Sequence, residues 1–277
     1  MRDFVYTAPS FVREDSINSI MSIRITAGGL CFSIQNGGEI LFLLSRSEKL
    51  NSEREQLEFL LGVLSENKFD ELKFNSIKVY VASQYKLLLP NSEAVAGKSE
   101  VWMRTLCDKP YADAQISRAS IDELNATLLF YKVNGFEEYL SGLSDNVQYS
   151  NLAQPFIKNS LASIPVKSSE SWVFVEYSAG VIDIAVAKGR KLQFFNSYQA
   201  TTSEEALFYL LQVIKMHNLN KKVNLVFSGE VDNRDDMIYA TLKRYEPSIT
   251  MAANVNLKGI CENENMEIMP LFVHILG

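Results

Sequence analysis

The sequence predicts an α/β protein made of two similar halves in tandem, each a mixed five-stranded sheet flanked by helices. Three observations support this prediction. The chain repeats itself at a constant shift of 150 positions, each copy opens with three short strands, and each continues into a helix with the same N-terminal signature. A repeat of this length indicates a duplicated domain, because solenoid periods are about 20–50 residues.

The two predicted helices carry the clearest repeat. Each has Ser or Thr followed three positions later by Glu, a capping box that satisfies free backbone donors at a helix start. Apolar residues then follow at i, i+3, i+4 and i+7, which is typical of a helix with one buried face. The matching sets are Ser52, Glu55, Leu57, Leu60, Leu61 and Leu64 in the first copy, and Thr202, Glu205, Leu207, Leu210, Leu211 and Ile214 in the second.

The first half is expected to cover residues 1–167. Strands are predicted over 22–26, 30–35 and 39–44, with glycine turns between them, followed by the helix over 52–65 and a strand over 77–82. Residues 84–125 have no counterpart in the second copy and are predicted to be an insertion, helical over 92–107. Regular structure is expected to resume with strands at 127–133 and 147–149 and helices at 136–143 and 152–164.

The second half is expected to cover residues 168–277, after a linker that contains Pro165 and Lys167. Strands are predicted over 172–177, 181–187, 191–197 and 223–227, with the capped helix over 203–218. A helix over 235–245, a short strand over 249–253 and an apolar tail over 271–276 complete it. Three meander strands followed by helix-linked strands predict a mixed sheet with helices on its faces.

Composition narrows the function classes. The net charge is -6 and the basic residues form no run or stripe, which argues against a nucleic-acid surface. No apolar stretch approaches the roughly 18 residues of a membrane span, and residues 1–10 do not have the apolar core of a signal peptide. Cys31, Cys107 and Cys261 are odd in number and far apart, so they suggest neither a disulfide framework nor a zinc site. We therefore expect a cytoplasmic protein.

Two such units in tandem, with an irregular insertion in the first, resemble the actin-like ATPase superfamily, whose halves have the ribonuclease H-like fold. More narrowly, the chain resembles an uncharacterised bacterial family with this fold. The resemblance covers nearly the whole chain and depends on topology and duplication. It implies a nucleotide cleft between the halves and ATP with Mg²⁺ as the cofactor.

In the superfamily, a turn after the first strand of each half carries an Asp, which organises Mg²⁺, and glycines whose amides hold phosphates. Here the first turn is Thr26-Ala27-Gly28-Gly29 and the second is Tyr177-Ser178-Ala179-Gly180, so neither has the Asp. A third turn, packed under adenosine in the superfamily, corresponds to Ser228-Gly229. The candidate cofactor-binding residues are thus Gly28, Gly29, Ser178, Ala179, Gly180, Ser228 and Gly229.

Each of these residues also has a purely structural explanation. Gly28 and Gly29 suit a tight hairpin with or without a ligand, and this is the favoured interpretation. Glu176, the carboxylate nearest the second turn, is expected to be solvated or paired at a strand end. For Ser228 and Gly229 the alternatives are even, because a glycine after a buried strand suits both a ligand site and an ordinary turn.

Other chemistries have less support. His217 is expected near a helix C-terminus, where it complements the helix dipole, and His274 is expected to be a packed tail residue. The acidic cluster Asp232, Asp235 and Asp236 is explained by a solvated helix start. The chain has no Walker A motif or nucleophile elbow, so neither a catalytic residue nor a metal ligand is assigned.

Three functions remain open. The first is a non-catalytic module that keeps the hinged fold in order to bind a protein partner. The second is a functional ATP-binding protein or ATPase with unusual ligands such as Glu176 or Ser178. The third, phosphorylation of a small molecule as in sugar kinases, is weaker because no catalytic base can be assigned.

Overall fold

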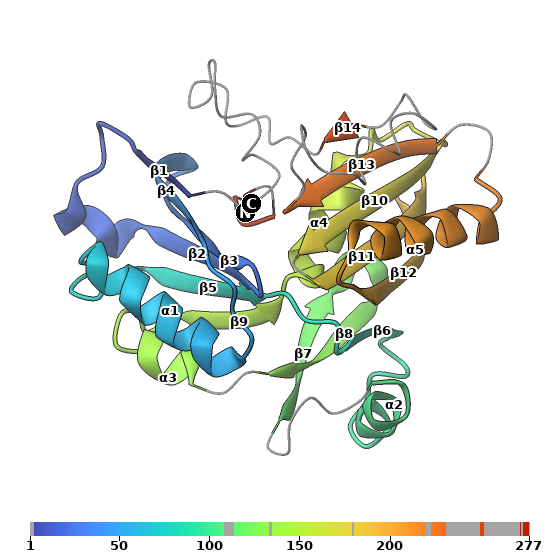
Figure 1. The fold of residues 1–277 in the computed structure, drawn as a ribbon, viewed down its shortest axis with the longest axis horizontal. Coiled ribbons are helices and arrows are strands. Elements are labelled where there is room, and N and C mark those ends of the chain that lie inside the picture. Colours follow the sequence, from blue (N-terminus) through green and yellow to red (C-terminus); the bar gives the residue numbers. More distant parts are fainter. Residues whose placement is uncertain are drawn as a thin grey trace.

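The computed structural model describes residues 3–107, 114–132, 135–178, 180–219, 223–230, 250–251, 272 and 274–276. The strands described form three sheets, of six, five and three strands. The six- and five-stranded sheets form two lobes side by side, and the three-stranded sheet lies below them in Figure 1. The two lobes correspond to the two copies of the sequence repeat.

The first lobe is built on a sheet with the order β1-β4-β3-β2-β5-β9. Strands β2, β3 and β4 form the predicted antiparallel meander, and β5 and β9 continue the sheet in parallel. The sheet has six strands and not the expected five, because β1 pairs with the edge of β4. The elements are β1 (Phe4–Thr7), η1 (Arg13–Asn18), β2 (Ile20–Thr26), β3 (Gly29–Asn36), β4 (Glu39–Ser47), α1 (Glu53–Glu66), β5 (Ser76–Val81), α3 (Phe136–Leu140) and β9 (Val147–Asn151). Helix α4 (Ala153–Ser163) follows β9 in the chain but packs on the second lobe.

The second lobe repeats the core of this order as β12-β11-β10-β13-β14. Strands β10, β11 and β12 form its antiparallel meander. As in the first lobe, two parallel strands continue the sheet, β13 beside β10 and β14 beside β13. The predicted helix over 235–245 lies outside the described residues. The elements are β10 (Ser171–Ser178), β11 (Gly180–Lys188), β12 (Lys191–Ala200), α5 (Ser203–Met216), β13 (Val223–Gly229) and β14 (Thr250–Met251).

Both capped helices form where the repeat predicts them. Ser52 Oγ accepts a hydrogen bond from the Glu55 amide, and Thr202 Oγ1 accepts one from the Glu205 amide, each at 3.2 Å. In α5 the capping box is complete. In α1 the Glu55 carboxylate instead accepts from the backbone of Asn51 at 2.7 Å, so the reciprocal bond moves by one residue. Both caps thus fix the start of the helix that follows the meander.

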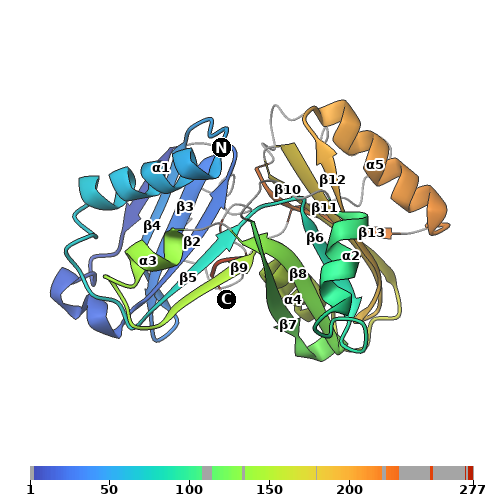
Figure 2. The same cartoon turned by 90° about the horizontal axis from the view of Figure 1, so that it is seen from below.

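The insertion forms a separate small sheet with the order β6-β8-β7, seen from below in Figure 2. The strand predicted over 127–133 forms as β8, but it pairs with β6 and β7 and not with the large sheet. One helix, α2, packs on the sheet. The elements are β6 (Lys86–Pro90), α2 (Lys98–Leu106), β7 (Gln115–Ile121), η2 (Asp122–Leu124) and β8 (Ala126–Lys132).

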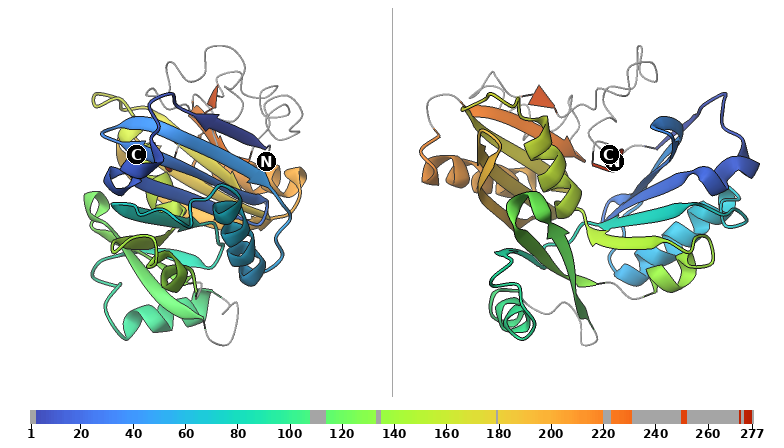
Figure 3. Two further views of the ribbon diagram at one scale, coloured as in Figure 1. Left: turned by 90° about the vertical axis from the view of Figure 1, so that its left-hand side faces the viewer. Right: turned by 180° about the vertical axis from the view of Figure 1, so that it is seen from behind.

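Each large sheet is buried on both faces. Helices α1 and α3 cover one face of the first sheet, and α5 covers the matching face of the second. The opposite face of the second sheet is covered by α4, through Phe156 and Ile157. The opposite face of the first sheet packs against Phe272, Ile275 and Leu276, described residues near the C-terminus. Figure 3 shows the two lobes from the side and from behind.

The hairpin turns of the two halves are related by a different sequence shift from the helix caps. In the first hairpin Thr26 pairs with Gly29, and in the second Ser178 pairs with Val181. These turns are related by a shift of 152, whereas the helix caps Ser52 and Thr202 are related by a shift of 150. On the hairpin shift, Thr26 corresponds to Ser178, and two residues earlier Arg24 corresponds to Glu176.

Candidate functional site

A buried ion pair joins the two lobes at these equivalent positions. Arg24 on β2 donates through Nη2 to Glu176 Oε1 on β10 at 2.6 Å, and to Ser178 Oγ at 2.8 Å. Both charged side chains are 1% exposed. In a pseudo-symmetric protein, identical residues at these positions would face one another with equal charge. Opposite charges instead bind directly.

Glu176 is held in its ionised form by this contact. Burial opposes ionisation, but Arg24 and a hydrogen bond from His274 outweigh burial, so the pKa of the Glu176 carboxyl lies below its usual range. Ser178 Oγ also lies 3.2 Å from Glu176 Oε1, as a donor to that oxygen. The sequence predicted a carboxylate that was either solvated or paired, and the structure shows that it is paired.

A second carboxylate approaches Arg24 from the end of β13. Glu230 Oε1 accepts a hydrogen bond from Thr26 Oγ1 at 2.5 Å and lies 3.9 Å from Arg24 Nη2. The Glu230 amide donates to the Tyr177 carbonyl at 2.7 Å, which fixes the turn that carries this carboxylate. Arg24 therefore lies between two acidic side chains of the second lobe.

His274 connects the C-terminal residues to the same cluster. Its Nε2 lies 2.9 Å from Ser228 Oγ and 3.3 Å from Glu176 Oε2. Since Ser228 Oγ donates its proton to the Val175 carbonyl at 3.0 Å, the His274 nitrogen acts as the donor to Ser228. His274 is buried, as predicted for a packed tail residue, and its edge contacts the ring of Phe156 on α4.

Gly229 leaves room for Glu176. Its φ is +94°, and a Cβ there would lie 2.1 Å from the Tyr177 carbonyl oxygen and 2.6 Å from Glu176 Oε1. Only glycine adopts this backbone conformation at low cost and also avoids both clashes. A bulky side chain at Gly229 would therefore disturb the fold as well as any ligand site. The buried Ser228 hydroxyl contacts Val175 and His274 and is likewise part of the packing.

The first hairpin turn has its own structural requirements. The Gly28 amide donates to Thr26 Oγ1 at 3.0 Å within the turn. Gly29 has φ +132°, and a Cβ there would lie 2.1 Å from the Arg46 carbonyl oxygen on β4. Gly29 thus has a structural role as a glycine, whereas Gly28 takes part in the hairpin through its backbone amide.

The second hairpin turn is more open. Ser178 belongs to the ion-pair cluster, and Ala179 lies outside the described residues. Gly180 has φ +82° and no atom within 4 Å of the position a Cβ would take. Of the seven candidate cofactor-binding residues, Ser178, Ser228 and Gly229 surround Glu176, and Gly28 reaches the cluster through Thr26. The acidic cluster at Asp232, Asp235 and Asp236 lies outside the described residues.

A second buried ion pair attaches the small sheet to the second lobe. Lys86 Nζ on β6 lies 2.8 Å from Asp183 Oδ1 on β11, and both side chains are at most 5% exposed. Ser197 Oγ on β12 donates to the same oxygen at 2.6 Å. Burial raises the pKa of the Asp183 carboxyl despite the opposing effect of Lys86. The pair holds the insertion against the second sheet.

These side chains do not fit the magnesium–nucleotide site that the fold family implies. Neither hairpin turn carries the Asp, and Glu176, the carboxylate nearest the second turn, is already bound by Arg24. Gly229 accommodates that carboxylate. Among the described residues, no group of three or more His, Cys, Asp or Glu side chains is placed to hold a metal ion.

The sequence contains an indication, separate from the turn motifs, that Arg24 is a functional or paired residue. Arg24 is a charged residue in the centre of a predicted strand whose neighbours are apolar or carry hydroxyls, and such a residue is almost never buried without a partner. Its partner lies 152 residues away, which spacing alone does not indicate. Cys31 on β3 lies directly opposite Arg24 in the β2–β3 pair. Burial raises the pKa of the Cys31 thiol to about 12.

Comparison with known proteins shows the family and the fold. A family model described as "Protein of unknown function (DUF3822)" matches residues 9–249, so the chain belongs to this family. No curated protein matches the chain. Within the described residues no helix is long and apolar enough to cross a membrane.

Solved structures identify the fold as that of the actin-like ATPases. A Bacteroides thetaiotaomicron protein with actin-like ATPase fold and unknown function matches with a TM-score of 0.75 at 17% identity, over 92% of this chain and 99% of that one. A chain of the PilM-PilN type IV pilus biogenesis complex matches with a TM-score of 0.62 at 11% identity, over 93% and 96% of the two chains. The resemblance inferred from topology and duplication is therefore confirmed.

Proposed function

We propose that this protein is a non-catalytic member of the actin-like fold that acts as a protein-interaction module in the cytoplasm. The buried Arg24–Glu176 ion pair is the observation that supports this proposal. A triphosphate needs cations to neutralise its charge as it reacts. In this chain the interlobe contact is made by the protein's own charges, so closing the lobes needs no metal or nucleotide.

The catalytic alternative would require this pair to separate. Glu176 would have to exchange a charged hydrogen bond of 2.6 Å for a metal-bound water, and Arg24 would remain buried beside it. Removing one member of a buried ion pair costs about 3–5 kcal/mol. ATP hydrolysis through Glu176 is thus opposed by the same contact that holds the lobes together.

Exposed apolar side chains support the interaction role. Phe208 and Leu211 lie three residues apart on α5 and are 56% and 43% exposed. Large apolar side chains that share one exposed helix face are typical of protein-binding surfaces. The similar chain from the PilM-PilN complex shows that this fold occurs in an assembly of two proteins.

The test measures ATP binding and turnover on the intact chain. Phosphate release with millimolar Mg-ATP should equal that of buffer, and thermal unfolding should show no shift that depends on Mg²⁺. Glu176→Gln should leave both readings unchanged. Robust hydrolysis that Glu176→Gln abolishes would overturn the proposal and establish the ATPase alternative.

A further inference from the structure

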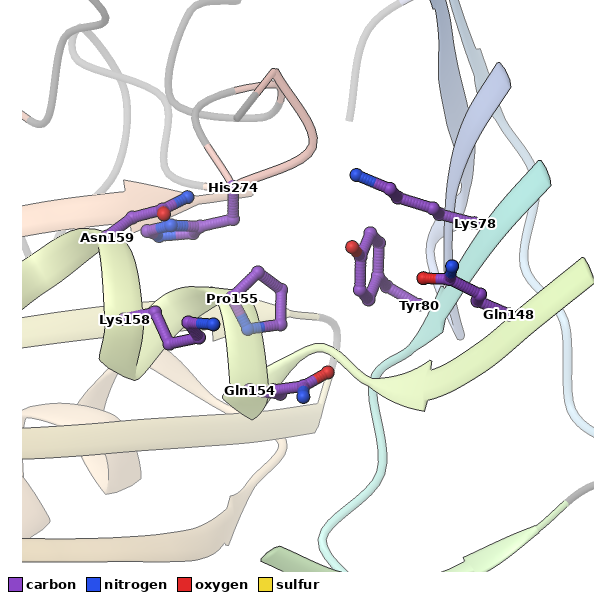
Figure 4. A pocket seen from close by; sticks show the side chains of 8 residues that line it. All are labelled: Lys78, Tyr80, Gln148, Gln154, Pro155, Lys158, Asn159 and His274. Atoms are coloured by element: carbon purple, nitrogen blue, oxygen red, sulfur yellow. The ribbon is translucent and has the colours of Figure 1, made fainter. Parts of the chain in front are cut away.

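A polar cavity of about 270 Å³ lies at the seam between the lobes, away from the hairpin turns. Strands β5 and β9 of the first sheet form one side, and the start of α4 forms the other (Figure 4). His274 lines it from the C-terminal residues. The lining residues are Lys78, Tyr80, Gln148, Gln154, Pro155, Lys158, Asn159 and His274.

The lining has positive charge and hydrogen-bond donors but no carboxylate. Lys78 makes no ion pair or hydrogen bond in the described part of the chain, and its ammonium extends across the cavity toward His274 (Figure 4). Lys158 Nζ lies 3.4 Å from Glu123, but both side chains are largely exposed, so this pair is weak. Two ammonium groups therefore face one cavity with little to neutralise them.

Neutral donors surround these charges. Gln148, Gln154 and Asn159 contribute carboxamides from both sides. Burial raises the pKa of Tyr80, which keeps its phenol protonated and able to donate a hydrogen bond. His274 is 6% exposed and its Nε2 contacts Ser228, so its ring forms a buried wall of the cavity.

We propose that this cavity binds the phosphate or carboxylate group of a small anionic ligand, with Lys78 as the main charged contact. The same oxyanion would lie within reach of Lys158 and the carboxamides. Because the cavity is built from the first sheet, from α4 on the second sheet and from His274, an occupant would contact elements of both lobes. The site shares no residue with the hairpin turns, but its His274 also contacts Ser228 and Glu176, so the cavity lies next to the ion-pair cluster.

Titration calorimetry on the intact chain tests the site with two probes, inorganic phosphate and succinate, which distinguish the two sources of the oxyanion. We expect one probe to bind with an affinity that falls as salt rises. Lys78→Gln should weaken binding by about tenfold or more, the usual effect of losing a charged hydrogen bond, and Lys78→Arg should retain most of it. Lys191→Gln removes an equal charge at an exposed position on β12 and should change nothing.

Failure to bind either probe at tens of millimolar, or binding that Lys78→Gln does not weaken, would overturn the inference. Circular dichroism of Lys78→Gln checks that the fold is retained. A third titration with Mg-ATP separates this inference from the proposed function. Nucleotide binding that depends on Glu176 and not on Lys78 would refute the proposed function. The inference about the cavity would then still depend on the phosphate and succinate titrations alone.

Discussion

Replacing Arg24 with methionine should destabilise the protein in a way that depends on pH. Methionine keeps most of the aliphatic volume of Arg24 but removes the charge, so Glu176 remains buried without its main partner. Breaking a buried ion pair from one side costs about 3–5 kcal/mol. Protonation of Glu176 limits this cost. For a carboxyl with an ordinary pKa of about 4.3, protonation costs about 3.7 kcal/mol at pH 7 and about 1 kcal/mol at pH 5.

The sign follows from the pKa of Glu176 in each protein. In the natural chain the folded pKa is lowered, so the pair contributes stability above the unfolded pKa, which is lost only as pH falls through the folded value. In Arg24→Met burial dominates and the folded pKa rises, so the penalty present at neutral pH is relieved as pH falls. The difference in unfolding free energy should shrink from about 3–4 kcal/mol at pH 7 to about 1–2 kcal/mol at pH 5.

Urea unfolding followed by circular dichroism at both pH values measures this difference. Arg54→Met removes an exposed arginine from α1 and should leave the unfolding free energy nearly unchanged. Adding Glu176→Gln to Arg24→Met should recover most of the loss at pH 7, because the uncompensated charge is gone. An equal loss at pH 5 and pH 7, or a loss no larger than that of Arg54→Met, would refute the reasoning.

Two further predictions concern Gly229 and α5. Gly229→Ala should lower the unfolding free energy by about 3 kcal/mol or more, because it adds a backbone clash at 2.1 Å to a positive φ. Gly180→Ala, with a similar φ and open space around it, should lower it by about 1–2 kcal/mol. Equal losses in urea unfolding would contradict this. Phe208→Asp should reduce capture of a protein partner by the tagged chain while leaving its stability intact. The exposed substitution Gln193→Asp on β12 is the control, and equal capture by all three proteins would argue against α5 as the contact surface.

The sequence predicted the parts of the fold that depend on local signals. The caps at Ser52 and Thr202 and the turns at Gly28 and Gly180 locate both meanders and both helices, because each depends on residues within a few positions. Strand β8 was predicted within two residues but assigned to the wrong sheet, since its partners β6 and β7 are set by pairing across the chain. Strand β1 was missed because a four-residue edge strand carries little pattern.

Residue types alone were not sufficient to predict the candidate site, because its main contacts join residues of different lobes. Serines and glycines at the turns were identified, but their nearest neighbours are Glu176, Arg46 and Thr26. Arg24 could have been suspected from its charge within a buried strand. Its pairing with Glu176 becomes evident only when the repeat is aligned on the hairpin turns, at a shift of 152.

The duplication places two equivalent positions, 24 and 176, face to face between the lobes. When two copies of one unit face each other, a residue retained in both copies meets its own kind, and two buried carboxylates stay close only if one is protonated or a cation lies between them. Here one copy has Arg24 and the other Glu176, and each ion neutralises the other. The lobes are thus held together by the chain itself, with His274 and Glu230 completing the contact. This contact supports the proposal that the lobes are joined without a nucleotide.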